Sequence, residues 1–178
     1  MCAGCPRFDE RGFMGKGARP CDVLFLLGNP ADSELDRNRP FSGRAMSVLN
    51  SAIADIAKEG DRYRNFTRYI AYSTRCGGEK ADTLAREKCA PQVLQEIHTA
   101  QPKVIVPLGL DAVKALGLKV TRLGNISGRE LTVMVSGIKY RVLPSMNINQ
   151  VMMDTGLYNT FRNDIRRAVD YAYKPILG

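Results

Sequence analysis

The sequence predicts an α/β fold, in the form of a three-layer α/β/α sandwich around a mainly parallel central sheet. Short continuous apolar runs alternate along the chain with longer segments whose apolar residues recur at helical spacing. Such runs are typical of strands buried on both faces, and their alternation with helices is typical of parallel sheets. The 178 residues contain no internal repeat, low-complexity tract or linker. We therefore expect a single domain that spans residues 1–178.

The first half of the chain supplies two expected strands and one helix. Residues 22–27, DVLFLL, form an apolar run that ends at the turn-forming residues 28–30. Residues 42–60 carry apolar side chains at helical spacing, with Ser42 available as the N-cap and a glycine as the stop signal. Residues 66–72 are predicted to form the second strand.

The second half continues the alternation. A proline opens the segment 91–100, and proline is tolerated in the first turn of a helix. The other expected elements are a strand at 103–108, a short helix at 109–116, strands at 131–135 and 139–143, and a last helix at 154–172. Ligands of such sheets bind beyond the carboxyl ends of the strands. The loops after positions 27, 72, 108 and 143 are therefore the expected site.

The charge balance favours a polyanionic partner. Twenty-six Lys and Arg against eighteen Asp and Glu give a formal net charge of +8, which suits DNA binding, although a basic solvated surface would give the same balance. No apolar run is long enough to cross a membrane, and the N-terminus does not resemble a secretion signal. We expect a cytoplasmic monomer that has DNA as its partner and no contact with a membrane.

Four of the five cysteines form a pattern. Cys2 and Cys5 make a C-x2-C, and Cys76 and Cys89 form a second pair. In an intracellular chain this favours a four-thiolate metal site over a disulfide framework or scattered buried thiols. The spacing alone leaves both zinc and iron-sulfur open. Cys21 precedes an apolar run and is expected to be a buried, unreactive thiol.

The loop motifs resemble those of the iron-sulfur members, family 4, of the uracil-DNA glycosylase superfamily. LGNPA at 27–31 and RPFSG at 39–43 occupy the places of that family's GEAPG and GRPFVG motifs. YIAYSTRC at 69–76 and LPSMNI at 143–148 stand for YITNVVKC and LPTYHP. The Asn29-Pro30 pair resembles the GINPG motif of the mismatch-specific uracil and thymine glycosylases. The resemblance runs nearly end to end, and the order of the motifs together with the four cysteines makes it specific.

The resemblance implies a uracil-DNA glycosylase-like fold and a DNA glycosylase, which is a hydrolase of N-glycosyl bonds. Such an enzyme flips a uracil-like or modified base out of DNA, hydrolyses its bond to deoxyribose and leaves an abasic site. The resemblance also implies a 4Fe-4S cluster in preference to zinc, with Cys2, Cys5, Cys76 and Cys89 as ligands. The implied setting is base-excision repair of DNA damage or defence against viral DNA.

The resemblance assigns roles within the pocket. Asn29 is expected to position the attacking water, although Gly28 and its neighbours would form a turn in any protein. Phe41 is expected to stack on the flipped base; judged without the motif, an aromatic residue before a helix belongs to the core. Gly28 and Tyr72 complete the base-binding set. Asn147 stands where the family has a histidine that stabilises the departing base.

Two of these positions depart from the family. Tyr72 replaces an asparagine that reads uracil, and a phenol offers one hydroxyl and more bulk than an amide. Asn147 is a weaker donor than the family's histidine. A modified pyrimidine is therefore an open alternative to uracil. The same changes would suit an inactive DNA-binding or replication-accessory protein on this fold or, less directly, an enzyme of RNA or nucleotides, whereas Asn29 favours a DNA glycosylase.

Several residues are candidates for contact with DNA. Arg44, Arg129 and Arg141 lie at or near glycine-containing turns and are expected to meet phosphates, although solvated arginines are as common. Ser145 and Met146 lie where the family inserts a loop into the duplex, and their segment would otherwise begin the last helix. The acidic residues of the first loop are expected to be solvated charges and not a general base, although one of them could support the attacking water: Asp32, Glu34 and Asp36.

Overall fold

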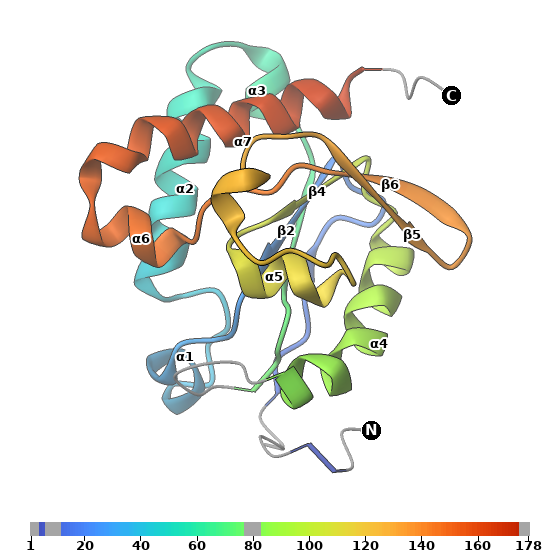
Figure 1. Ribbon diagram of the computed structural model, residues 1–178. Coiled ribbons are helices and arrows are strands. Elements are labelled where there is room, and N and C mark those ends of the chain that lie inside the picture. The colour runs from blue at the N-terminus through green and yellow to red at the C-terminus, as the bar shows by residue number, and fades with distance from the viewer. Residues whose placement is uncertain (1–3, 6–11, 77–82, 175–178) are drawn as a thin grey trace.

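A single six-stranded sheet forms the centre of the protein (Figure 1). The computed structural model describes residues 4–5, 12–76 and 83–174. The strands lie in the order β1-β3-β2-β4-β6-β5. Their bounds are Lys16–Gly17 for β1, Val23–Leu27 for β2, Arg68–Tyr72 for β3, Val104–Pro107 for β4, Leu131–Val135 for β5 and Ile138–Val142 for β6. The inner strands β3, β2, β4 and β6 pair in parallel, whereas β1 and β5 pair antiparallel at the two edges.

Helices cover both faces of this sheet, as the sequence predicts (Figure 1). One face packs against α2, α6 and α7, with α3 beside α2; the other packs against α4 and α5. The helix bounds are Asp32–Asp36 for α1, Arg44–Ala57 for α2, Asp61–Asn65 for α3, Thr83–Ala100 for α4, Leu110–Ala115 for α5, Ile148–Met153 for α6 and Tyr158–Ala172 for α7. Short 3-10 turns lie at Leu123–Asn125 and Thr155–Leu157.

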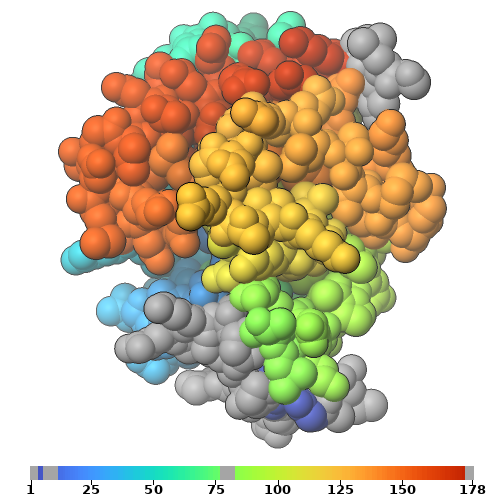
Figure 2. All heavy atoms as spheres, in the orientation of Figure 1, coloured from blue at the N-terminus to red at the C-terminus, as the bar shows by residue number. Residues whose placement is uncertain are grey.

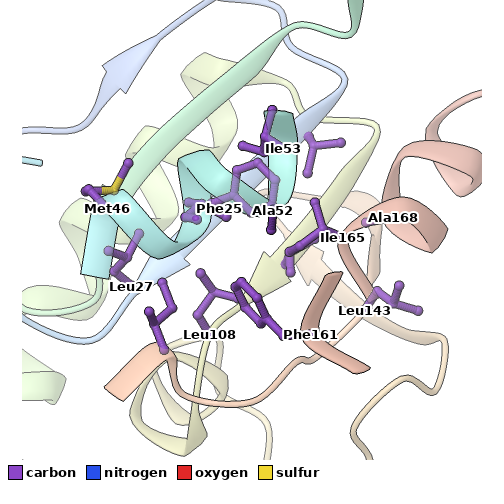
Figure 3. Packing of buried hydrophobic residues seen from close by; sticks show 14 of the residues in the cluster. Phe25, Leu27, Met46, Ala52, Ile53, Leu108, Leu143, Phe161, Ile165 and Ala168 are labelled. Atoms are coloured by element: carbon purple, nitrogen blue, oxygen red, sulfur yellow. The ribbon is translucent and has the colours of Figure 1, made fainter. Parts of the chain in front are cut away.

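Strand β2 consists entirely of apolar residues because it is buried on both faces. Phe25 and Leu27 point toward α2 and α7, where Figure 3 shows Phe25 packing near Ile53 and Ile165. The alternate residues, Leu24 and Leu26, point toward α4 and α5. All five residues of β2 are buried, because side chains alternate between two faces that are both covered by helices.

The start of α2 corrects the expected cap. The helix begins at Arg44 with Gly43 as its N-cap, and the Ser42 hydroxyl donates to the carbonyl oxygen of Arg39 at 2.6 Å instead of capping. The carboxylate of Glu34 accepts from the backbone N–H groups of Ser42 and Gly43 at 2.8 and 3.0 Å. A carboxylate that is distant in sequence therefore supplies the cap, and it also suits the positive end of the helix dipole.

Two other helix boundaries differ from expectation. Helix α4 is described from Thr83, so Pro91 lies inside it and does not open it. The exposed position of Pro91 explains its tolerance, because the carbonyl that loses its helical partner can meet water. The last helix, expected from residue 154, begins at Tyr158 as α7, and a 3-10 turn and the separate helix α6 precede it. A second N-cap at Asp154, whose carboxylate accepts from the Gly156 N–H at 2.9 Å, marks the division.

Candidate active site at the carboxyl ends of the strands

Two adjoining cavities lie at the carboxyl end of β2. The larger, of about 450 Å³, is bounded by the loop 29–31, α1, the first turn of α2, Tyr72 and the exposed side of α6. The smaller, of about 80 Å³, lies between the end of β2 and the loop that leads into α6. Asn29 lines both cavities. Figure 2 shows the surface hollowed between α6, in orange, and α1, in blue.

The smaller cavity brings together the two residues that the sequence predicts to be catalytic. Asn29 and Asn147 both line it, together with Gly28. Asn147 caps α6, because its Oδ1 accepts from the Asn149 N–H at 2.9 Å. Its amide lies over Gly109: a Cβ at that glycine would come within 3.2 Å of Asn147 Nδ2. With a φ of +100° as well, position 109 requires glycine, and this leaves room for the amide.

Backbone contacts fix the loop that carries Asn29. The carbonyl oxygen of Gly28 accepts from the Ser73 hydroxyl at 2.7 Å and from the N–H groups of Ser73 and Thr74 at 2.9 and 3.0 Å. Asn29 is half-buried, and its Nδ2 donates to the carbonyl oxygen of Pro30 at 3.2 Å. The loop thus forms the turn expected at residues 28–30 and also places Asn29 beside the two cavities. Gly28 acts through its backbone, where it joins the ends of β2 and β3.

Tyr72 and Phe41 form a stacked pair at the edge of the larger cavity. Their ring centroids are 4.5 Å apart and the planes are inclined by 8°. The Tyr72 hydroxyl accepts from the Phe41 N–H and donates to Glu34 Oε2, both at 3.0 Å. Burial is the main cause of the raised pKa of Tyr72, so the phenol stays neutral. The hydroxyl of Tyr72, a residue expected to bind the base, is thus hydrogen-bonded within the protein.

Glu34 is a site residue whose environment the sequence did not predict. It was expected to be a solvated charge, but only 5% of it is exposed. Besides Tyr72 and the start of α2, it bonds the N–H of Ala31 at 2.9 Å. Its spacing from Ala31 is that of a capping box, in which the third residue of a helix reaches back to the cap. Alanine at the cap position hid that signal, since the usual pattern begins with Ser or Thr.

The comparisons with known proteins agree with this geometry. The model of the uracil DNA glycosylase superfamily matches residues 14–169. The chain belongs to this superfamily. Similar proteins include the type-4 uracil-DNA glycosylases of Pyrobaculum aerophilum, 25% identical over 92% of this chain and 86% of the relative, and of Saccharolobus solfataricus, 23% identical over 98% and 84%. The DNA polymerase of Bacillus phage SP01 is 22% identical over 89% of this chain, which corresponds to 16% of the polymerase.

Membership of the uracil-DNA glycosylase superfamily, with relatives of this kind, confirms the prediction of a DNA glycosylase, a hydrolase of N-glycosyl bonds. The alternative of an inactive DNA-binding protein is not favoured. DNA is accordingly the partner. Within the described residues, the structure contains no helix that has both the length and the apolar character to span a membrane.

The arginines of this glycosylase differ in what they can do for DNA. Arg44 is exposed at the first position of α2 and lines the larger cavity. Arg129 is exposed but lines neither cavity. Arg141 corrects the expectation of a phosphate contact: only 8% of it is exposed, and it pairs with Glu130 at 3.1 Å and donates to the carbonyl oxygen of Tyr171 at 2.9 Å. Arg141 ties β6 to the end of α7.

Ser145 and Met146, the other residues expected to contact DNA, differ in burial. No surface of Ser145 is exposed, and its hydroxyl donates to the buried carboxylate of Asp164 at 2.7 Å. Its backbone bonds both the carbonyl oxygen of Pro107 and the N–H of Gly109 at 3.0 Å. Met146 is half-buried against the α2 and α7 side of the core. In this structure Ser145 therefore positions the loop that carries Asn147.

Three of the four expected thiolate ligands lie in described residues. Cys76 lies in the loop after β3 and is 6% exposed, Cys89 lies inside α4 and is 3% exposed, and Cys5 is partly exposed. Cys2 lies outside the described residues. A Cβ at Gly4 would lie 3.7 Å from Lys88 Nζ, so Gly4 and Cys5 run beside the segment that carries Cys89. In the described part of the chain, no three metal-binding side chains gather around one point.

Cys21, predicted to stand apart from these ligands, is a buried thiol. It is 3% exposed, at the entry to β2. Burial and, secondarily, the neighbouring charge of Asp22 raise the pKa of Cys21 to about 12. A thiol with so high a pKa is a poor nucleophile and a poor metal ligand at neutral pH, which agrees with the prediction.

Proposed function

We propose that this glycosylase hydrolyses the N-glycosidic bond of a flipped base with Asn29 holding the attacking water and Asn147 stabilising the departing base. The observation that carries the proposal is the convergence of Asn29 and Asn147 on one small cavity. They reach it from loops that follow different strands, and Asn29 also borders a second cavity large enough for a nucleobase. This arrangement provides separate places for the water and the base.

The smaller cavity suits an ordered water. A cavity needs about 10–15 Å³ of space open to the centre of a water molecule to hold one water, and this cavity has about 80 Å³. The side-chain oxygen of Asn29 can accept a hydrogen bond from the water, although an amide is too weak a base to take its proton. That suffices where the glycosidic bond breaks early and leaves a sugar cation, because the water then needs placement more than deprotonation.

Asn147 supplies a hydrogen-bond donor to the same cavity. Its Oδ1 is engaged in capping α6, and this orients the amide so that Nδ2 is its donor. A preorganised donor aimed at a developing negative charge lowers the barrier to departure of the base. Because a neutral amide stabilises charge less than an imidazolium, we expect this contribution to be smaller than that of the family's histidine.

The larger cavity receives the flipped base and the backbone beside it. Arg44 at its rim offers a guanidinium to a phosphate. Asn149 lines both cavities and adds a polar group near the base. The target that we propose is a uracil-like or modified base of intracellular DNA, removed by a monomer in base-excision repair or in defence against foreign DNA.

We also propose that Cys2, Cys5, Cys76 and Cys89 hold a 4Fe-4S cluster. The burial of Cys76 and Cys89 and the course of Gly4 and Cys5 beside α4 support this assignment. Four thiolates in a buried setting suit such a cluster. Its contribution is to fasten the N-terminal segment to the start of α4 and the loop after β3; hydrolysis of a glycosidic bond needs no electron transfer.

Substitution of the two asparagines tests the mechanism. Asn29→Ala should lower the single-turnover rate of base release about 100-fold to 1,000-fold, and Asn147→Ala should lower it less. DNA affinity should stay within about threefold of the starting value, because the lost contacts act on the transition state. Asn163→Ala, an exposed asparagine on α7, is the matched control. Base release by Asn29→Ala at the rate of the unmodified protein would overturn the proposed role of Asn29.

A further inference from the structure

The stacked pair of Tyr72 and Phe41 has the geometry of a base lying on an aromatic platform. The rings are nearly parallel, with 4.5 Å between their centroids, so no third ring fits between them. Phe13 approaches Tyr72 from another direction, with its centroid 6.5 Å away and its plane inclined by 37°. The Tyr72 side chain therefore fills a slot between protein groups, and only 2% of it is exposed.

The polar end of Tyr72 is held as the carbonyl oxygen of a base would be. Its hydroxyl oxygen accepts the Phe41 N–H, and its hydrogen is directed to Glu34. Glu34 is itself fixed by the N–H groups of Ala31, Ser42 and Gly43. Phe41 has a φ of +58°, a conformation that non-glycine residues rarely adopt and that surrounding contacts must maintain. Here the Tyr72 hydroxyl and the Glu34 carboxylate provide those contacts, at the two peptide groups on either side of Phe41.

We propose that Tyr72 is an internal occupant of the stacking slot on Phe41 and selects against uracil at this site. An unmodified pyrimidine can stack on Phe41 only where Tyr72 is absent. The flipped base of the proposed reaction lies instead in the larger cavity, for which Tyr72 forms a wall. The inference rests on the proposed function, in that it specifies which face of Tyr72 the flipped base meets.

Displacement of Tyr72 by a base is disfavoured by its place in the sheet. Tyr72 is the last residue of β3 and is paired in register with Leu27 of β2. Moving the ring out of the slot would break both hydrogen bonds of its hydroxyl and leave the buried carboxylate of Glu34 with one donor fewer. A small pyrimidine offers less apolar area than the ring that it would replace. The slot therefore stays filled by the tyrosine.

Removal of the ring tests the proposal through binding. The measured quantity is the affinity for a duplex with one uracil relative to the same duplex with thymine, determined in an Asn29→Ala background so that the base is retained. Tyr72→Ala should raise this ratio at least tenfold. Tyr72→Phe keeps the ring and should leave the ratio near that of the parent. Tyr72→Asn, which retains a polar group for Phe41 and Glu34, serves as a second opening variant in case Tyr72→Ala folds poorly.

The two hypotheses fail in different ways. A folded Tyr72→Ala or Tyr72→Asn variant with no gain in uracil preference would overturn the proposal that Tyr72 fills the slot. A uracil preference in the Asn29→Ala parent and in Tyr72→Phe as strong as that of Tyr72→Ala would overturn it as well. Neither result bears on base release by the unmodified protein, which tests the proposed function. A gain in uracil binding would support the slot even if no variant with Asn29 intact released a base, and that second outcome would count against the chemistry alone.

Discussion

The carboxylate of Glu34 joins the first loop, the start of α2 and the end of β3. It accepts from three backbone N–H groups and from the Tyr72 hydroxyl while remaining buried. Hydrogen bonds to a charged group contribute about 1.5–3 kcal/mol each, and donors left buried without a partner cost a similar amount. Glu34 therefore sets the relative positions of the loop that carries Asn29 and of Tyr72.

The first prediction concerns the stability that Glu34 provides. Glu34→Ala should lower the free energy of unfolding by about 3 kcal/mol or more, and Glu34→Gln by less, because its amide keeps one accepting oxygen. Urea denaturation measures both values. Asp36→Ala, an exposed carboxylate in the same helix, is the control and should change stability by at most about 0.5 kcal/mol. Equal effects at the two positions would contradict the structural role.

Asp164 gives a prediction about pH. Burial raises the pKa of Asp164, against the opposing effects of the Ser145 hydrogen bond and the Arg167 charge. The folded protein then retains a proton that the unfolded chain releases near pH 3.9. The stability from this proton is present below that pH and is lost as the pH rises through the folded pKa. Asp164→Asn keeps an oxygen for Ser145 but has no group that titrates. Its free energy of unfolding, relative to that of the unmodified protein, should therefore rise as the pH is raised from 4 to 7.

Urea denaturation of the two proteins at both pH values measures this difference. A relative stability that stays constant or falls across the interval would show that Asp164 is not held protonated by its surroundings.

Two elements carry proposed ligands of the cluster: the loop after β3 carries Cys76, and the first half of α4 carries Cys89. Protein purified without air should contain about four iron atoms per chain. Cys76→Ala or Cys89→Ala should release the iron, whereas Cys21→Ala, buried apart from them at the entry to β2, should retain it. Metal analysis and visible absorbance provide the measurement. Zinc at about one atom per chain would contradict the iron assignment while leaving the ligands in place.

Most elements could be predicted because their apolar patterns are determined by burial. The run in β2 is buried throughout, and α7 buries Phe161, Ile165 and Ala168 at helical spacing. The start of α4 could not be predicted from Pro91, because a proline is read as the opening of a helix unless its exposure is known. The separation of α6 from α7 depends on a local cap at Asp154, which the apolar pattern does not record.

The sequence motifs indicated the site residues that follow the strands. The contacts that side chains make between different loops could not be predicted. Asn29 and Asn147 were singled out by the resemblance of their motifs to those of the family, and the structure places both after strands whose carboxyl ends face the same edge. The stacking of Tyr72 on Phe41 and the burial of Glu34 depend on three loops folding together. No spacing rule relates residues so far apart in sequence, so the motifs did not predict that Tyr72 stacks on Phe41.

At the scale of the whole molecule, the net charge of +8 leads to a prediction about salt. Affinity for DNA should fall steeply as salt rises, because bound phosphates release their counterions. Arg44→Ala should weaken binding to all sequences about equally and reduce the slope of log affinity against log salt by about one. Lys139→Ala removes an exposed charge on the β5–β6 hairpin and serves as the control. An equal change in slope for both variants would argue against a phosphate contact at the rim of the larger cavity.

The most direct measurement of the central claim is mass analysis of the free bases released from a panel of natural, mismatched, damaged and modified DNAs. The unmodified protein should release one class of base and leave abasic sites, and Asn29→Ala should release the same base about 100-fold to 1,000-fold more slowly. Failure of the unmodified protein to release a base from any of these DNAs would contradict the glycosylase mechanism. Release at equal rates by the two proteins would contradict the role of Asn29 in it.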